Sequence, residues 1–282
     1  GITANIEDEE VWLFNDGIGL LIIELQYRLP KFLSLEKRLK IIGECNYSLY
    51  RKNNSDTATK PLEHNGKAFT SDLYALALTL IDSTKIRSGD DGEDLSKRRA
   101  FTYTYISSAY EIDFKNNENT LIGITKHYTS DYHINIDEPL SGYKVYAPFE
   151  NVKHYSSEEG ALTVISKSNN SPFLQSYYEN SVKKIYTPLV MINLHGASAL
   201  LNMINLSQNM DNNPKIRLNE LESLSNSILD YRLNYSYQVA SEISLHNQFH
   251  KVWNEALSVE EMLVKVSDTI SDYRAHNEDL YI

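Results

Sequence analysis

The chain has 282 residues, 41% of them hydrophobic and 23% charged, so it can bury a substantial core and lacks the composition of a disordered protein. Its 38 acidic residues outnumber its 27 basic ones. The resulting net charge of -11 argues against a nucleic-acid partner, because phosphate backbones are bound by clustered Lys and Arg, and favours cations as partners. The single cysteine, Cys45, excludes an internal disulfide and fits a reducing cytosolic compartment.

The first half is expected to mix strands and helices. Two runs of strand-forming residues flank an Asn-Asp-Gly turn and predict a hairpin at 11–14 and 18–25. Ser34 is the expected N-cap of a helix to about residue 44, and Thr70 or Ser71 of another to about residue 81, with a polar loop between them at 51–66. Clusters of aromatic and β-branched residues predict four further strands, at 101–106, 121–125, 143–147 and 162–166.

The second half, from Ser171 onward, is expected to be helical. Pro172 lies just inside one predicted helix, and Pro188 kinks or restarts the next. After a break at 211–214, apolar residues recur every three or four positions and predict one very long helix. They are Leu218, Leu221, Leu224, Ile228, Tyr231, Tyr235, Val239 and Ile243. The fold class is therefore α+β, with an α/β domain at 1–170 and a helical region at 171–282.

Acidity is concentrated in the C-terminal quarter of the chain. Residues 211–282 hold six Lys or Arg and twelve Asp or Glu, which is a net charge of -6. One interpretation is a solvated helix face. The other is divalent-cation binding, because Mg²⁺ and Ca²⁺ prefer carboxylate oxygens.

Signatures of catalysis are missing from the sequence, which has no nucleophile elbow, phosphate-binding glycine loop or zincin motif, so we do not expect an enzyme. Cys45 is expected to be a buried structural thiol. Glu242, His246 and His250 follow one another at four-residue spacing, which would align them on one helix row as zinc ligands or as a surface or inter-helix polar row. The acidic cluster at 90–94 lacks the spacing of an EF-hand calcium loop and is expected to be solvated.

Several segments resemble CorA-like magnesium and divalent-cation transporter proteins. The stretch Leu-Ser-Asn-Ser-Ile-Leu-Asp-Tyr-Arg-Leu-Asn-Tyr at 224–235, with the stretch at 249–257, is similar to the long-helix region of that family. Residues 14–19 resemble its first hairpin, residues 98–106 a later strand, and residues 172–207 the helix pair that precedes the long helices. The resemblance is spread over most of the chain.

The resemblance implies a cytosolic α/β/α domain joined to long stalk helices, assembled as a homopentamer at the cytoplasmic face of the membrane. In that family, acidic sites bind Mg²⁺ at subunit interfaces and hold the pore closed. Residues 261–269 are similar to the part of the stalk helix that bears a regulatory carboxylate, which makes Glu261 the candidate metal ligand and Asp268 a second one.

The sequence also departs from the family. Its Gly-Met-Asn signature and both membrane helices are missing, so ion transport would lie outside these residues and this chain would be a soluble regulatory portion. Two alternatives remain open. One is a soluble helical scaffold or protein-interaction module related to the family, and the other is a zinc enzyme built on Glu242, His246 and His250.

Overall fold

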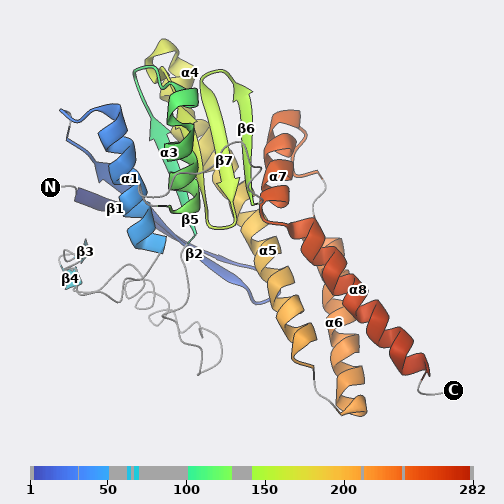
Figure 1. Cartoon of the computed structure of the whole chain (residues 1–282). Coiled ribbons are helices and arrows are strands. Elements are labelled where there is room, and N and C mark those ends of the chain that lie inside the picture. The colour runs from blue at the N-terminus through green and yellow to red at the C-terminus, as the bar shows by residue number, and fades with distance from the viewer. Residues whose placement is uncertain are drawn as a thin grey trace.

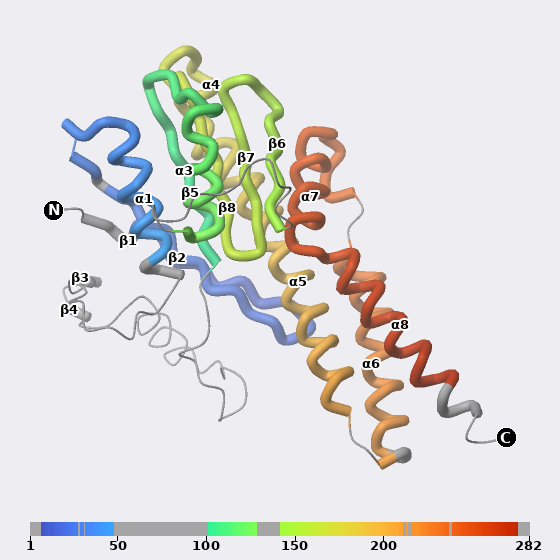
Figure 2. Tube along the Cα trace, viewed as in Figure 1, coloured from blue at the N-terminus to red at the C-terminus, as the bar shows by residue number. Residues whose placement is uncertain are grey.

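The computed structural model of the chain describes residues 3–30, 32–50, 62–64, 67–69, 101–128, 142–210, 213–236 and 239–279. The predicted helix at 70–81 and the acidic cluster at 90–94 lie outside these residues. Figure 2 shows the course of the chain as a tube coloured from the N-terminus to the C-terminus.

The chain begins with a long antiparallel hairpin, as the sequence predicts. Strand β1 (Thr3–Leu13) pairs with β2 (Gly19–Arg28). In the turn, Gly17 takes a positive φ of 87°, which a residue without a Cβ adopts readily. Asp16 Oδ1 accepts a hydrogen bond from the Ile18 amide at 3.2 Å, so the side chain helps to close the turn.

A four-stranded sheet forms the centre of the first half. Its spatial order is β5 (Thr102–Ser107), β8 (Gly160–Ile165), β7 (Val152–Ser157) and β6 (Tyr143–Phe149). Strands β5 and β8 run parallel, and the other neighbours run antiparallel. Three of the predicted strands are thereby confirmed, whereas β7 is not among the predictions. A short hairpin of β3 (Leu62–His64) and β4 (Lys67–Phe69) contradicts the end of the predicted loop at 51–66.

Two helices, α1 (Leu35–Tyr50) and α3 (Phe114–Lys126), cover one face of this sheet (Figure 1). Helix α1 begins as predicted, because Ser34 Oγ accepts a hydrogen bond from the Lys37 amide at 3.4 Å. Buried residues of the two helices and of the sheet form one hydrophobic cluster. Members of this cluster include Leu39, Ile106, Leu121, Ile122, Tyr155, Leu162 and Val164.

The strand predicted at 121–125 is wrong, because these residues are the last turns of α3. Asp113 caps this helix by accepting a hydrogen bond from the Asn116 amide at 3.0 Å. Every residue from 121 to 127 is buried. A helix end that is buried on all sides is apolar without helical periodicity, so its sequence resembles that of a buried strand.

The helices of the second half lie beyond the other face of the sheet, and some of them pack against it. They are η2 (Ser168–Asn170), α4 (Pro172–Gln175), the π-helix η3 (Tyr178–Tyr186), α5 (Thr187–Gln208), α6 (Pro214–Asn234), α7 (Ser244–Ala256) and α8 (Val259–Asp279). Helix α7 packs against β6 and β7, and α5 packs against α6, α7 and α8. Trp253, which is 1% exposed, is the largest side chain of this core, and its ring lies 5.7 Å from that of Phe101.

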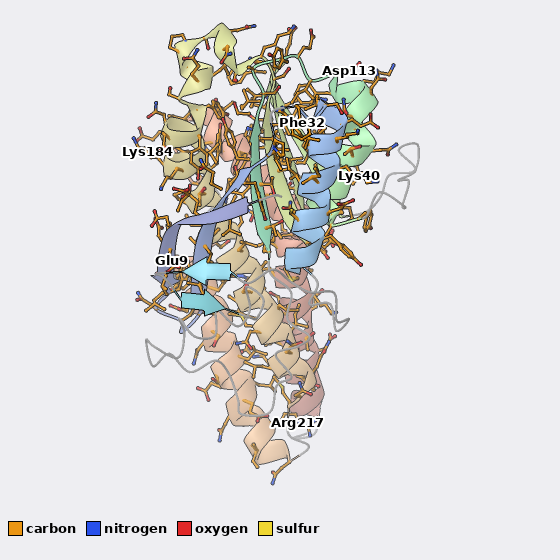
Figure 3. The ribbon with its side chains drawn as sticks, turned by 90° about the vertical axis from the view of Figure 1, so that its left-hand side faces the viewer. Glu9, Phe32, Lys40, Asp113, Lys184 and Arg217 are labelled. Carbon is orange, nitrogen blue, oxygen red and sulfur yellow. The ribbon has the colours of Figure 1, made fainter. Side chains whose placement is uncertain are left out.

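The molecule is elongated because α5, α6 and α8 continue beyond the sheet (Figure 1). In Figure 3, Phe32 and Asp113 lie toward one end and Arg217 of α6 lies at the other. The predicted change from mixed structure to helices at residue 171 is confirmed, whereas the division into two domains stays a prediction.

The very long helix predicted to reach Ile243 is wrong, because α6 ends at Asn234. The amides of Tyr235 and Ser236 both donate to the carbonyl of Tyr231, at 2.8 and 2.9 Å, so the helical hydrogen-bond pattern stops there. Ile243, the last residue of the predicted apolar series, is 54% exposed. Ile243 is therefore not one of the buried residues that the apolar spacing predicts.

One helical stretch among the described residues, at 178–208, is long and apolar enough to cross a membrane. Within its most apolar window, 56% is buried inside the molecule. This burial is that of a core helix, because the sheet and the other long helices cover it.

Candidate functional site

The predicted metal ligands lie on the outward side of α8. The inward side of this helix carries Val259, Val266 and Ile270, which are at most 8% exposed. Because a helix repeats every 3.6 residues, burying these positions turns the carboxylates between them toward solvent. We call Glu260, Glu261, Asp268 and Asp272, which are all exposed, the α8 acidic face.

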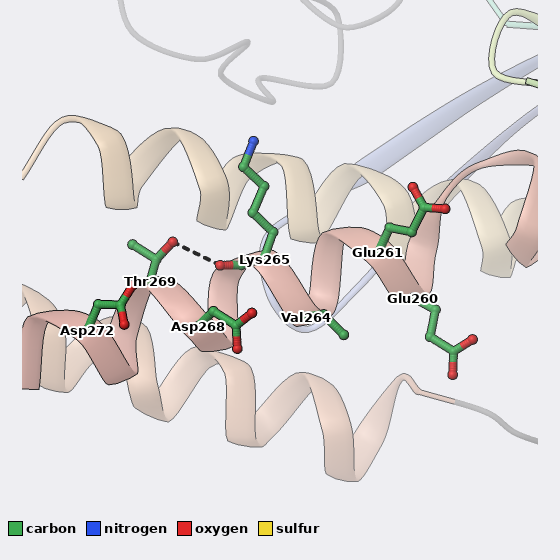
Figure 4. Close-up of a pocket in the computed structure, with 7 residues that line it drawn as sticks. All are labelled: Glu260, Glu261, Val264, Lys265, Asp268, Thr269 and Asp272. Carbon is green, nitrogen blue, oxygen red and sulfur yellow. Dashed lines mark hydrogen bonds between the residues drawn. The ribbon is translucent and has the colours of Figure 1, made fainter. Parts of the chain in front are cut away.

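The α8 acidic face lines a shallow depression that also includes Val264, Lys265 and Thr269 (Figure 4). All seven residues belong to one helix, so the depression is open to solvent and is not an enclosed cavity. Figure 4 shows Lys265 extending away from the carboxylates of Asp268 and Asp272. Among the described residues, no cation forms an ion pair with the four carboxylates, which leaves their charge available to a ligand.

The geometry of this face limits how it can bind a metal ion. Glu261 and Asp268 are separated by two helical turns, or about 10 Å along the axis, whereas Mg²⁺–oxygen bonds measure about 2.1 Å. One ion therefore cannot bind both side chains. Within the part of the chain that the structure describes, no group of three or more His, Cys, Asp or Glu side chains is arranged to hold a metal. The carboxylate chemistry suits Mg²⁺, but the ligand number requires water or a second molecule of this chain to complete it.

Glu242, His246 and His250 do not form the single helix row that their spacing predicts. Glu242 precedes α7, whose N-cap is Ile243, so it is not on the same helix row as the two histidines. His246 and His250 are 9% and 4% exposed and lie in the core. His246 Nδ1 lies 3.1 Å from Ser241 Oγ, and burial lowers the pKa of this histidine. His246 and His250 are therefore buried parts of the helix packing and not members of an exposed polar row.

A second acidic cluster, which the sequence reasoning missed, joins the hairpin to the π-helix η3. Lys183 Nζ lies 3.1 Å from Asp8 Oδ2 and 3.2 Å from Glu24 Oε2, and Tyr178 donates a hydrogen bond to Glu24. The bonds to Asp8 and then to Glu24 raise the pKa of Lys183 to about 12. The lysine therefore stays charged and bonds to both carboxylates, which makes this cluster a structural link between the hairpin and η3.

The turn of the hairpin makes another contact that was not predicted. His195 of α5 is 1% exposed, and its Nε2 lies 2.7 Å from Asp16 Oδ2. Phe14 stacks on the same imidazole with ring centroids 3.8 Å apart. These residues are far apart in the sequence, and no local signal connects them. The contact fixes the hairpin turn on the middle of α5.

Two further histidines are buried and neutral. His154 Nδ1 lies 2.8 Å from Thr163 Oγ1, and burial lowers the pKa of His154 to about 3. His127 Nε2 lies 2.9 Å from the carbonyl of Glu159, and burial lowers the pKa of His127 to about 4. Cys45 is half-buried and not fully buried as predicted. Its partial burial raises the pKa of the thiol, so the thiol is protonated at neutral pH.

Comparisons of this chain with models of protein families, with curated proteins and with solved structures found no match.

Proposed function

We propose that this chain is the cytosolic, cation-sensing regulatory domain of a CorA-type transporter of Mg²⁺ or a related divalent cation. The observation that carries the proposal is the α8 acidic face, a set of four exposed carboxylates on a helix whose other side is fixed in the core. The resemblance of residues 261–269 to a family segment with a regulatory carboxylate supports the same face. Ion conduction would lie in membrane helices outside this chain.

In this proposal, the acidic faces of neighbouring subunits share the bound cations. Glu261 and Asp268 each supply an incomplete ligand set, so a divalent ion gains ligands when a second acidic face approaches. Without the ion, the same approach places carboxylates of like charge together and is unfavourable. Cations therefore stabilise the assembled arrangement, which the family resemblance implies to be a homopentamer, and their loss loosens it.

The test is a measurement of thermal unfolding and of sedimentation over a Mg²⁺ titration, with NaCl at matched ionic strength as the control and Ca²⁺ as a second ion. Cation binding at ten times its Kd stabilises the folded protein by about 1.4 kcal/mol, which a midpoint shift detects. We expect Mg²⁺ to raise the midpoint and to increase the sedimentation coefficient beyond the NaCl control. Identical curves in Mg²⁺ and in matched NaCl would reject the proposal.

A second candidate function, a protein-interaction module, is favoured by the outer side of α6. Leu218, Leu229 and Leu233 are 49%, 56% and 74% exposed, and their spacing places them within roughly 60° of one another around the helix. Exposed leucines on one side of a helix are typical of a protein contact. Association that is independent of divalent cations and is lost in Leu229→Ser would favour this function over cation sensing.

A further inference from the structure

A small polar cavity lies where α5, α6, α7 and the start of α8 meet. Its volume is about 30 Å³. The lining residues are Ile192, Asn193, Gly196, Tyr231, Tyr235, Ser236, His250, Asn254 and Val259. None of them is acidic or basic apart from a histidine, so the cavity is suited to a neutral polar ligand and not to a metal cation.

Asn193 presents an unused hydrogen-bond acceptor at this cavity. The residue is 2% exposed, and its Nδ2 donates to the carbonyl of Leu189 at 2.7 Å. This bond determines which end of the amide is the oxygen. Asn193 Oδ1 is fully buried and accepts no hydrogen bond from any described residue. A buried amide oxygen is costly to leave without a partner, so a donor is required here.

Tyr231 brings a second polar group to the same cavity from α6. The residue is 3% exposed, and burial raises the pKa of its hydroxyl to about 12, so the hydroxyl is protonated at neutral pH. A Cβ built on Gly196 would lie 2.8 Å from Tyr231 Oη, which shows that the hydroxyl lies directly against α5 where that helix has no side chain. Among the described residues, no hydrogen bond to this hydroxyl is formed.

We infer that this cavity is a binding site for one ordered water molecule that links Asn193 of α5 to Tyr231 of α6. The cavity volume of about 30 Å³ exceeds the roughly 10–15 Å³ that a cavity needs in order to hold one water molecule. A water molecule donates to Asn193 Oδ1 and accepts from the Tyr231 hydroxyl, which satisfies both groups at once. The inference is independent of the proposed cation sensing.

The test combines a crystal structure of the whole chain with oxygen-17 magnetic relaxation dispersion in solution, which counts long-lived internal waters. The variants are Tyr231→Phe, which removes only the hydroxyl, and Tyr103→Phe as a matched control. The Tyr103 hydroxyl is also buried but lies 2.9 Å from Thr163 Oγ1, away from the cavity.

We expect electron density for a water at hydrogen-bond distance from both Asn193 Oδ1 and Tyr231 Oη. We also expect the count of long-lived waters to fall by one in Tyr231→Phe and to stay unchanged in Tyr103→Phe. A cavity without such density, or an equal water count in Tyr231→Phe and the wild type, would overturn the inference. The crystal structure of the wild type decides the point even if a variant fails to fold.

Discussion

His195 in the middle of α5 donates through Nε2 to Asp16 in the turn of the N-terminal hairpin, with 2.7 Å between Nε2 and Oδ2. The histidine side chain is 2% exposed and the aspartate side chain 22% exposed, so the bond lies at the edge of the core. Hydrogen bonds to a charged group in such a position contribute more than exposed ones, because water competes less well for the partners. The pair therefore holds the hairpin turn on the helical half.

The first prediction concerns this pair. Asp16→Ala leaves a buried imidazole without its acceptor and should reduce the free energy of unfolding by roughly 1–3 kcal/mol. Asp16→Asn retains an acceptor oxygen and should recover part of the loss. Glu7→Ala, at an exposed position of the same hairpin, should change stability by no more than about 0.5 kcal/mol. Urea unfolding of the three variants checks this, and equal losses in Asp16→Ala and Glu7→Ala would contradict it.

The second prediction concerns the α8 acidic face. Glu261→Gln and Asp268→Asn should each lose most of the Mg²⁺-induced rise in the thermal midpoint and in sedimentation, because each removes one carboxylate ligand. Glu222→Gln on α6 removes the same charge from another exposed position and should keep the full response. Since all three variants have the same net charge, non-specific screening affects them equally. A uniform response across the three would assign the Mg²⁺ effect to screening.

The third prediction is that alanine substitution has opposite effects on stability at two buried glycines. A Cβ on Gly160 would lie 2.8 Å from the Thr125 carbonyl oxygen and 2.9 Å from His127 Nε2, so Gly160→Ala should destabilise the protein by roughly 1–3 kcal/mol. A Cβ on Gly123, inside α3, would have its nearest contact at 3.7 Å. Gly123→Ala should therefore stabilise the helix by about 0.5–1 kcal/mol. Thermal unfolding of both variants measures the two signs, and a shift of the same sign in both would count against this account of the packing.

The fourth prediction is a loss of stability in mild acid. Burial lowers the pKa of His127 to about 4 and that of His154 to about 3 in the folded protein, whereas both are near 6.5 when unfolded. Below pH 6.5 the unfolded chain thus binds more protons than the folded one. The two neutral histidines therefore contribute fully to the free energy of unfolding above about pH 6.5. As the pH falls toward their pKa values in the folded protein, this contribution decreases by about 1.4 kcal/mol per pH unit for each histidine.

His127→Asn tests this titration, because Asn tolerates the left-handed backbone that His127 adopts at φ 57° and does not titrate. Between about pH 6 and pH 4.5, the free energy of unfolding of this variant should fall less steeply than that of the wild type, by about one proton's contribution. The slope is compared rather than the absolute stability, because the substitution also removes a hydrogen bond. If the free energy of unfolding fell equally steeply with pH in the variant and in the wild type, the acid sensitivity would not come from His127.

Local sequence signals were sufficient to predict the turns and helix starts that depend only on neighbouring residues. The Asn-Asp-Gly turn, the Ser34 cap and Pro172 at a helix start are confirmed, because turn and cap chemistry acts within four residues. The same reasoning failed at 121–125 and at the end of α6. There the apolar pattern is compatible with two backbone conformations, and the choice between them depends on contacts from elsewhere.

The end of α6 shows how such a contact acts. The apolar spacing continues past Tyr235, yet Asn247 of α7 accepts hydrogen bonds from the amides of Ala240 and Ser241, both at 2.9 Å. These amides are satisfied without a helix, so the chain turns into α7 instead of continuing α6. The side chain responsible lies in the next helix, outside the window that a periodicity analysis uses.

For the candidate site, the sequence by itself determined that Glu261 and Asp268 share one helix and that the C-terminal region is acidic. Only the tertiary structure decided that these carboxylates face outward, that Glu242 is separated from His246 and His250, and that Asp16 meets His195. Helical spacing fixes the relative positions of residues on one element, because backbone hydrogen bonds set its geometry locally. Which side of that element is buried depends on the apolar area that distant segments cover, and this is a property of the packed chain.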